Sequence, residues 1–146
     1  MNKYDEIKTL IEESTNVEFA DFGDGVSEEW IKKAENRLGF ELPNTYKWWL
    51  KNYGGGEIYG EEIFSIYEQD FDTVVGGDIV YMHELNKNNN NFNKNSLVVC
   101  ETNDEVFYFD ISKRKYDGEF PIYCWNSKNK YAEDFIDFLK KRIIEN

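Results

Sequence analysis

The sequence predicts an α+β fold in which N-terminal helices precede a mostly antiparallel sheet and a C-terminal helix packs on one face of that sheet. Apolar residues first recur at helical spacing, then alternate in short segments rich in Ile, Val, Tyr and Phe, and finally return to helical spacing. A chain of 146 residues, 17% of them aromatic, is long enough for one packed core. We therefore expect a single domain over residues 1–146.

Two helices are predicted in the first forty residues. The first covers Lys3–Ser14, with an apolar stripe of Tyr4, Ile7, Leu10 and Ile11. The segment Val17–Val26 contains Asp-Phe-Gly-Asp-Gly at residues 21–25, a sequence typical of a turn. Ser27 then caps a second helix that Gly39 ends.

A third helix is predicted to begin at Pro43, because proline suits the first turn of a helix. Its buried stripe is expected to contain Tyr46, Trp49, Leu50 and Tyr53, and three glycines end it.

Short strands are predicted in the middle of the chain, over Glu57–Gly60 and Ile63–Tyr67. Residues 71–86 are ambiguous, since two glycines disfavour a helix in the first half while Ile79, Met82, His83 and Leu85 suit one in the second. The polar segment Asn86–Asn95 is expected to be a surface loop.

Three further strands and a closing helix complete the prediction. The strands cover Ser96–Glu101, Glu105–Asp110 and Glu119–Trp125, with hairpin spacing between the first two. The closing helix covers Tyr131–Ile144 and faces inward through its aromatic and aliphatic residues.

The net charge of −12 is concentrated in two blocks. Residues 1–29 carry −7, and residues 57–84 carry −8 with no Lys or Arg at all. Such a field repels nucleic acid and anionic membranes, so neither is expected as a partner, and it attracts a basic protein. The alternative is that the acidic surface only keeps the protein in solution.

The N-terminal residues lack the apolar run of a signal peptide, and no segment is apolar for the length of a bilayer. Cys100 and Cys124 do not form a CxxC pair. We therefore expect a cytoplasmic protein with two reduced thiols.

The run from Ser27 to Tyr67 carries a recognisable pattern. A helix ends in Leu38-Gly39, then Glu-Leu-Pro-Asn-Thr-Tyr-Lys-Trp-Trp-Leu covers residues 41–50, and Tyr-Gly-Gly-Gly follows at residues 53–56. This pattern, with the later hairpin and final helix, resembles the SUKH superfamily from about Ser27 to the C-terminus. The turn at residues 102–104 departs from the glycines of many relatives, and the Asn-rich loop is longer and more biased in composition than the resemblance leads us to expect.

The resemblance implies a binding role. Bacterial members of the superfamily look like immunity proteins, which bind a cognate toxin domain, often a nuclease with a basic groove. An acidic inhibitor would supply the charge that the nucleic acid supplies. The resemblance also implies an alternative, a cytosolic adaptor that organises signalling or cell-wall synthesis.

Catalytic motifs are absent from the sequence, so we expect a non-enzymatic protein without cofactor or metal. Two alternatives stay open. Carboxylate pairs such as Glu61/Glu62 or Asp70/Asp72 would suit an acid-dependent hydrolase if they faced each other across a cleft. The oxygen ligands of Asp70, Asp72 and Asp78, together with His83, would suit a metal ion.

The best candidate for binding is the acidic and aromatic segment Glu57–Asp72. Its carboxylates are expected to steer a basic partner, while most of its aromatic rings face the core. The predicted partner-binding residues are Glu57, Glu61, Glu62, Tyr67, Glu68, Asp70 and Asp72. The protein is expected to be a monomer or a weak homodimer.

Overall fold

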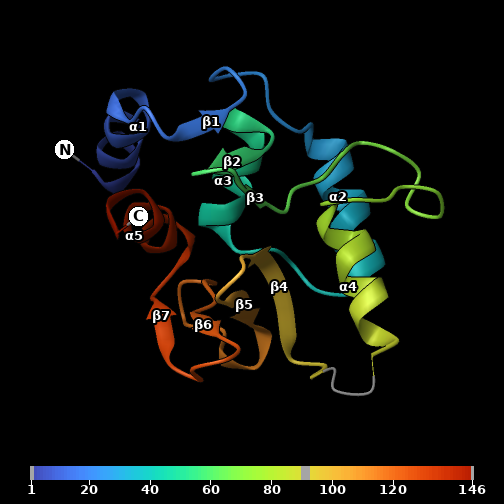
Figure 1. Cartoon of the computed structure of the whole chain (residues 1–146). Coiled ribbons are helices and arrows are strands. Elements are labelled where there is room, and N and C mark those ends of the chain that lie inside the picture. Colours follow the sequence, from blue (N-terminus) through green and yellow to red (C-terminus); the bar gives the residue numbers. More distant parts are fainter. Residues whose placement is uncertain (1, 90–92, 146) are drawn as a thin grey trace.

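A computed structural model describes residues 2–89 and 93–145 and confirms the α+β class (Figure 1). Its helices are α1 (Lys3–Glu13), α2 (Glu28–Leu38), α3 (Asn44–Tyr53), α4 (Ile79–Lys87) and α5 (Phe135–Glu145), with a short 3₁₀ turn at Ile111–Lys113. Its strands are β1 (Val17–Phe19), β2 (Gly56–Ile58), β3 (Glu61–Ile63), β4 (Ser96–Glu101), β5 (Val106–Asp110), β6 (Ile122–Cys124) and β7 (Lys130–Ala132).

The seven strands form one sheet in sequence order, and every pair of neighbouring strands is antiparallel. Within the described ranges, parallel pairing is confined to an isolated bridge between Ser65 and Asp78. Short connections join β2 to β3 and β4 through β7, because an antiparallel pair needs only a turn, whereas helices α2 and α3 connect β1 to β2 and helix α4 connects β3 to β4.

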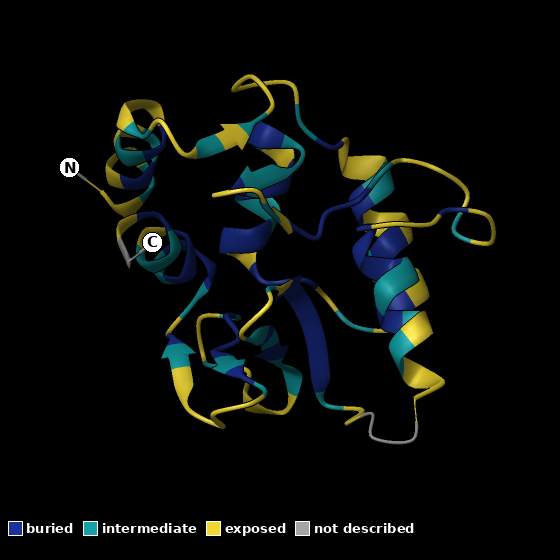
Figure 2. Ribbon diagram, viewed as in Figure 1, coloured by how far each residue is buried: buried dark blue, intermediate teal, exposed yellow. Residues whose placement is uncertain are grey.

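The core lies on one face of this sheet, which we call the inner face. The Phe109 ring of β5 lies 5.4 Å from Tyr46 of α3, and the Phe107 ring lies 5.4 Å from Phe138 of α5. Figure 1 shows α1 beside α5 on one side of the molecule and α2 beside α4 on the other, in agreement with the contacts between these helices. The opposite face of the sheet, the outer face, is covered less evenly. β4 is buried along most of its length, whereas β1 has one exposed and two partly buried residues (Figure 2).

The predicted boundaries of α2 are confirmed. The Ser27 hydroxyl accepts a hydrogen bond from the Trp30 backbone N–H, and Gly39 ends the helix in a left-handed conformation with φ of 91°. The ambiguous segment before the Asn-rich loop contains α4. Asp78 begins this helix by accepting hydrogen bonds from the backbone N–H groups of Val80 and Tyr81.

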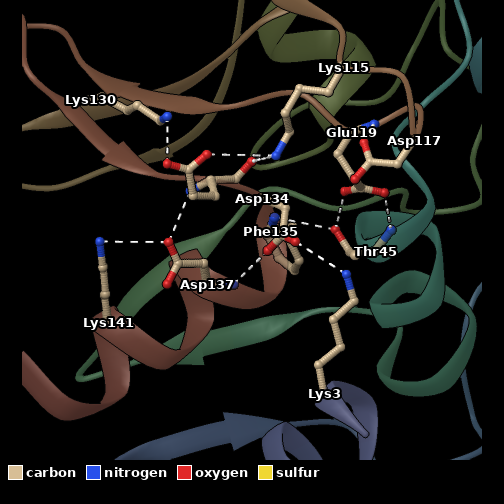
Figure 3. A network of polar contacts seen from close by, with 11 residues as sticks. Lys3, Thr45, Lys115, Asp117, Glu119, Lys130, Asp134, Phe135, Asp137 and Lys141 are labelled. Carbon is tan, nitrogen blue, oxygen red and sulfur yellow. Dashed lines mark hydrogen bonds and ion pairs between the residues drawn. The ribbon is translucent and has the colours of Figure 1, made fainter.

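α3 is capped from a distant part of the chain. Pro43 stands one position before the helix and has no side chain able to cap it. The buried carboxylate of Glu119 instead accepts hydrogen bonds from the Thr45 backbone N–H, at 3.1 Å, and from the Thr45 hydroxyl, at 2.6 Å. That hydroxyl accepts a hydrogen bond from the Phe135 N–H, so one carboxylate joins the starts of α3 and α5 (Figure 3).

The turn predicted within Val17–Val26 is confirmed by the hydrogen bond from the Asp24 N–H to the Asp21 carbonyl oxygen, but the first residues of this segment form β1, which was not predicted. Gly56 allows this pairing, since a Cβ at Gly56 would lie 2.3 Å from the Glu18 carbonyl oxygen. The strands predicted over Glu57–Gly60 and Ile63–Tyr67 are also displaced. Tyr59 and Gly60, with φ of 52° and 76°, form the turn that joins β2 to β3.

The last helix begins later than predicted. Residues 130–132 form β7 against β6, and Asp134 then accepts a hydrogen bond from the Asp137 N–H at the start of α5. Tyr131 was assigned to the inward face of the helix. Its ring does pack inward, with its centroid 4.7 Å from that of Phe107, but the residue lies in strand β7.

The two preceding strands are shorter than predicted, as β5 starts at Val106 and β6 covers only residues 122–124. In the segment predicted as a loop, residues 86–87 belong to α4 and residues 90–92 lie outside the described ranges. Among the described residues, no helix combines the length and apolarity needed to cross a bilayer.

Candidate functional site: the acidic outer face of strands β1 to β3

Three glutamates lie side by side on the outer face of the first three strands. The register pairs Glu18 of β1 with Glu57 of β2, and Glu57 with Glu62 of β3. Directly paired residues point to the same face, with Cβ atoms about 4.5–5.5 Å apart. Their neighbours Ile58 and Ile63 point inward and are buried. We call Glu18, Glu57 and Glu62 the glutamate row.

The glutamate row concentrates like charge on a small surface. Glu18 and Glu62 are exposed and Glu57 is partly exposed. The ion pairs formed within residues 2–89 and 93–145 involve other carboxylates, so no lysine or arginine of these ranges neutralises the row. Like charges on directly paired positions of a sheet destabilise it by a few tenths of a kcal/mol, up to about 1 kcal/mol. The row is therefore a local electrostatic cost of the fold.

An open depression with a volume of about 440 Å³ adjoins the row. The glycine segment Gly54–Gly56 forms part of its wall, and the exposed side chains of Asp24, Glu62 and Glu68 also line it. Glu62 thus belongs both to the glutamate row and to the depression. Five carboxylates from three segments of the chain consequently share one acidic surface.

Tyr67 holds Glu62 in place within this surface. Its hydroxyl donates a 2.5 Å hydrogen bond to the Glu62 carboxylate and accepts a 2.8 Å hydrogen bond from the Gly77 N–H. Burial and the bond to Glu62 raise the pKa of Tyr67 to about 12, so the hydroxyl keeps its proton at neutral pH. One Glu62 oxygen stays outside this bond and is able to meet a partner.

The remaining predicted site residues lie elsewhere. Glu61 alternates to the inner side of β3, where it forms an ion pair with Arg142 of α5. Asp72 forms a 2.8 Å ion pair with Arg37 of α2, and Asp70 lies beside it, where it accepts a hydrogen bond from the Asp72 N–H. The predicted group is therefore divided. Glu57, Glu62, Tyr67 and Glu68 lie together, whereas Glu61, Asp70 and Asp72 do not join them.

Two members of the acidic surface, Glu18 and Asp24, were absent from the sequence prediction. The signal for Glu18 was the alternation Val17-Glu18-Phe19, which indicates a strand with one polar face. Both residues belong to the first acidic block of the sequence, and Glu57, Glu62 and Glu68 belong to the second. The pairing of β1 with β2 brings the two blocks together.

The metal alternative finds no support in the arrangement of its residues. Among the described residues, no three groups able to bind a metal ion come together. Asp78 is engaged by three backbone N–H groups, and His83 is buried against the Phe40 ring. Burial and the charge of Lys87 lower the pKa of His83 to about 4.

The cysteines and the carboxylate pairs offer little to an enzyme. Cys100 and Cys124 are buried, and burial raises the pKa of Cys100 to about 12, far from that of a reactive thiolate. Asp24, Glu62 and Glu68 share the depression, but all three side chains are exposed, unlike the enclosed pair that a hydrolase needs.

A protein-family model described as "SMI1-KNR4 cell-wall" (SUKH_6) matches residues 28–139, from the start of α2 into α5. Among solved structures, the chain is similar to a crystal structure of a protein from Pseudomonas syringae pv. tomato, with a TM-score of 0.68 and 12% sequence identity. That match covers 97% of this chain and 99% of the other, so the folds agree over nearly their whole length. The family match itself starts after β1 and Glu18.

Proposed function

Because the chain belongs to the SUKH_6 family, described as SMI1-KNR4 cell-wall, we propose that it is an immunity protein that binds and blocks a cognate toxin domain. The observation that carries the proposal is the glutamate row, in which Glu18, Glu57 and Glu62 repel one another on the outer face. A basic partner would neutralise these charges. The repulsion that destabilises the free protein would then be absent from the complex, and this difference would favour binding.

A nuclease is the toxin that this surface suits best. A nuclease groove presents lysines and arginines to the phosphates of its substrate. Neighbouring strands are about 4.8 Å apart, so the row presents its carboxylates at short, regular intervals. In this proposal the protein acts in the cytoplasm, without a catalytic step, cofactor or metal, by occupying that groove as a monomer.

The other predicted contact residues have a more limited part in the proposal. Glu68 belongs to the acidic surface, whereas Asp70 lies outside it beside Asp72, and neither carboxylate forms an ion pair with a described residue. Glu61 and Asp72 already neutralise Arg142 and Arg37, so contacts with a toxin would require an exchange of partners.

The test is co-expression with the protein encoded by the neighbouring open reading frame, scored by growth and by co-purification. The triple variant Glu18→Lys, Glu57→Lys, Glu62→Lys should slow association at least tenfold at low salt, because long-range attraction sets the rate of encounter. Association of the wild-type protein should also slow as salt concentration rises.

A matched control separates the site from the net charge. The variant Glu6→Lys, Glu13→Lys, Glu41→Lys changes the net charge equally at exposed positions outside the row. It should retain most of the wild-type association rate. Equal slowing in both variants would show that the total charge matters and that the row is not the interface.

The adaptor alternative is favoured by one observation, the words "cell-wall" in the description of the matching family. An adaptor would protect against no toxin and would co-purify with other cellular proteins. The adaptor function would be favoured if the wild-type protein did not rescue growth when co-expressed with an active toxin from the neighbouring open reading frame.

A further inference from the structure

A groove runs along the outer face of β4 and β5, between these strands and the last turn of α4. Its volume is about 220 Å³, below the roughly 300–1,000 Å³ of clefts that hold drug-sized ligands, so it has room for a single side chain. The lining residues used below are Asn86, Ser96, Val98, Glu101, Val106 and Trp125.

Ser96 provides an unused polar group at this groove. Its side chain is 2% exposed, and its hydroxyl has no hydrogen-bond partner in the described part of the chain. A buried hydroxyl without a partner costs about 1–3 kcal/mol, so such groups usually meet a ligand or an ordered water molecule. The hydroxyl therefore points to an occupant that brings a hydrogen-bonding group.

The groove favours an apolar side chain over an ion. Val98 and Val106 are aliphatic, and the Trp125 ring packs edge-to-face with the Tyr108 ring, with 5.6 Å between their centroids. Among the described residues that line the groove, Glu101 alone is charged, so an anion would be repelled. An apolar or aromatic side chain next to a lysine or arginine matches both the walls and this single charge.

The groove continues the glutamate row. Ile63 of β3 pairs with Cys100 of β4, so the antiparallel register places Glu62 opposite Glu101. Glu101 pairs in turn with Val106 of β5, whose carbonyl oxygen accepts a hydrogen bond from the Trp125 N–H. One line across the outer face thus passes from acidic side chains to apolar ones.

We infer that this groove is a second contact surface for the same basic partner, and that it receives an apolar or aromatic side chain adjacent to a lysine or arginine. The inference rests on the proposed function, because continuity with the glutamate row identifies the partner. The two surfaces then have different tasks. The row accelerates encounter through charge, and the groove slows dissociation through burial of an anchor side chain.

The first test measures the association and dissociation rate constants of the complex with the protein encoded by the neighbouring open reading frame. Val106→Trp fills the groove and should raise the dissociation rate constant at least tenfold with little effect on association, the reverse of the triple lysine variant. Ser96→Ala loses no hydrogen bond within the described chain, so it should keep or raise thermal stability while dissociation becomes about threefold faster. Unchanged dissociation in both variants would overturn the inference.

The second test needs no toxin. Acetyl-Trp-Lys-amide and acetyl-Trp-Glu-amide are titrated at millimolar concentration while the protein amide resonances are followed by NMR. The lysine peptide should shift the resonances of Ser96, Val98, Glu101 and Val106 at lower concentration than the glutamate peptide, and Val106→Trp should abolish the shifts. Shifts elsewhere, or equal responses to both peptides, would overturn the inference. If the wild-type protein binds no toxin yet passes this test, the proposed function fails and the groove remains a peptide site.

Discussion

Two regions of this molecule use glutamate in opposite ways. Glu119 is 3% exposed and accepts two hydrogen bonds from Thr45 at the start of α3. Glu57 is partly exposed and lies between Glu18 and Glu62 in the glutamate row. The first carboxylate is surrounded by donors and joins two helices, whereas the second is surrounded by like charge. In a chain with 29 acidic residues, the neighbours of a carboxylate separate a structural role from a binding role.

The two regions also differ in how removal of a carboxylate changes the free energy of unfolding. Removal of a hydrogen-bonded buried carboxylate leaves its donors unsatisfied, which destabilises the fold. Removal of one charge from a row of like charges relieves repulsion, which stabilises it. The same change of residue should therefore have effects of opposite sign in the two regions.

The largest effect is expected for Glu119→Ala. The change leaves the Thr45 N–H and hydroxyl without their acceptor, so the free energy of unfolding should fall by about 3 kcal/mol. Urea denaturation followed by circular dichroism measures this fall. Glu133→Ala is the matched control, because Glu133 is exposed in its ion pair with Lys130 and should leave the transition unchanged. Equal transitions for both variants would remove the distinction between the two regions.

The pH dependence of the free energy of unfolding tests whether His83, a second buried ionisable group, also affects stability. Its pKa lies at about 4 in the folded protein and near 6.5 in the unfolded chain. The unfolded chain therefore binds the proton first as pH falls from about 6.5 towards 4, and stability decreases over that window. We expect a loss of about 2 kcal/mol at pH 5 relative to pH 7.

The comparison for this prediction is His83→Leu, which cannot take up the proton. Protonation of the carboxylates affects both proteins alike, so the difference between their unfolding free energies isolates His83. The unfolding free energy of the wild-type protein, relative to that of His83→Leu, should therefore decrease as the pH falls from about 6.5 to 4. Parallel pH profiles would contradict the prediction.

The smallest effect on stability is expected in the glutamate row. Glu57→Gln removes the central charge and should raise the free energy of unfolding by about 0.5 kcal/mol, measured by urea denaturation at low salt. The gain should disappear at high salt, where exposed charges are screened. A loss of stability instead would mean that Glu57 has a structural partner and belongs with Glu119.

The sequence predicted α2 and β4 well because their signals are local. Ser27 and Gly39 bound α2 through their own side-chain and backbone chemistry, and β4 occupies the residues predicted for it, Ser96–Glu101. β1 and β7 escaped prediction because each has only three residues: turn residues follow β1, and Tyr131 of β7 fits the apolar stripe of the helix that follows it.

The candidate site was predicted in part for the same reason. Strand alternation in the segment Glu57–Asp72 identified Glu57 and Glu62 as acidic and outward. It could not separate them from Glu61, whose cationic partner Arg142 lies 81 residues away in the sequence. Nor could it add Glu18, which reaches the site through the pairing of β1 with β2.

The sequence by itself determined the α+β class, the caps of α2, the acidic blocks and the family, since composition, local periodicity and a continuous motif carry these properties. Only the tertiary structure decided which carboxylates are structural and which form the glutamate row. That choice depends on the register of the strands and on donors contributed by distant residues. A hydrogen bond or a repulsion acts over a few ångströms in space, whatever the separation of its partners along the chain.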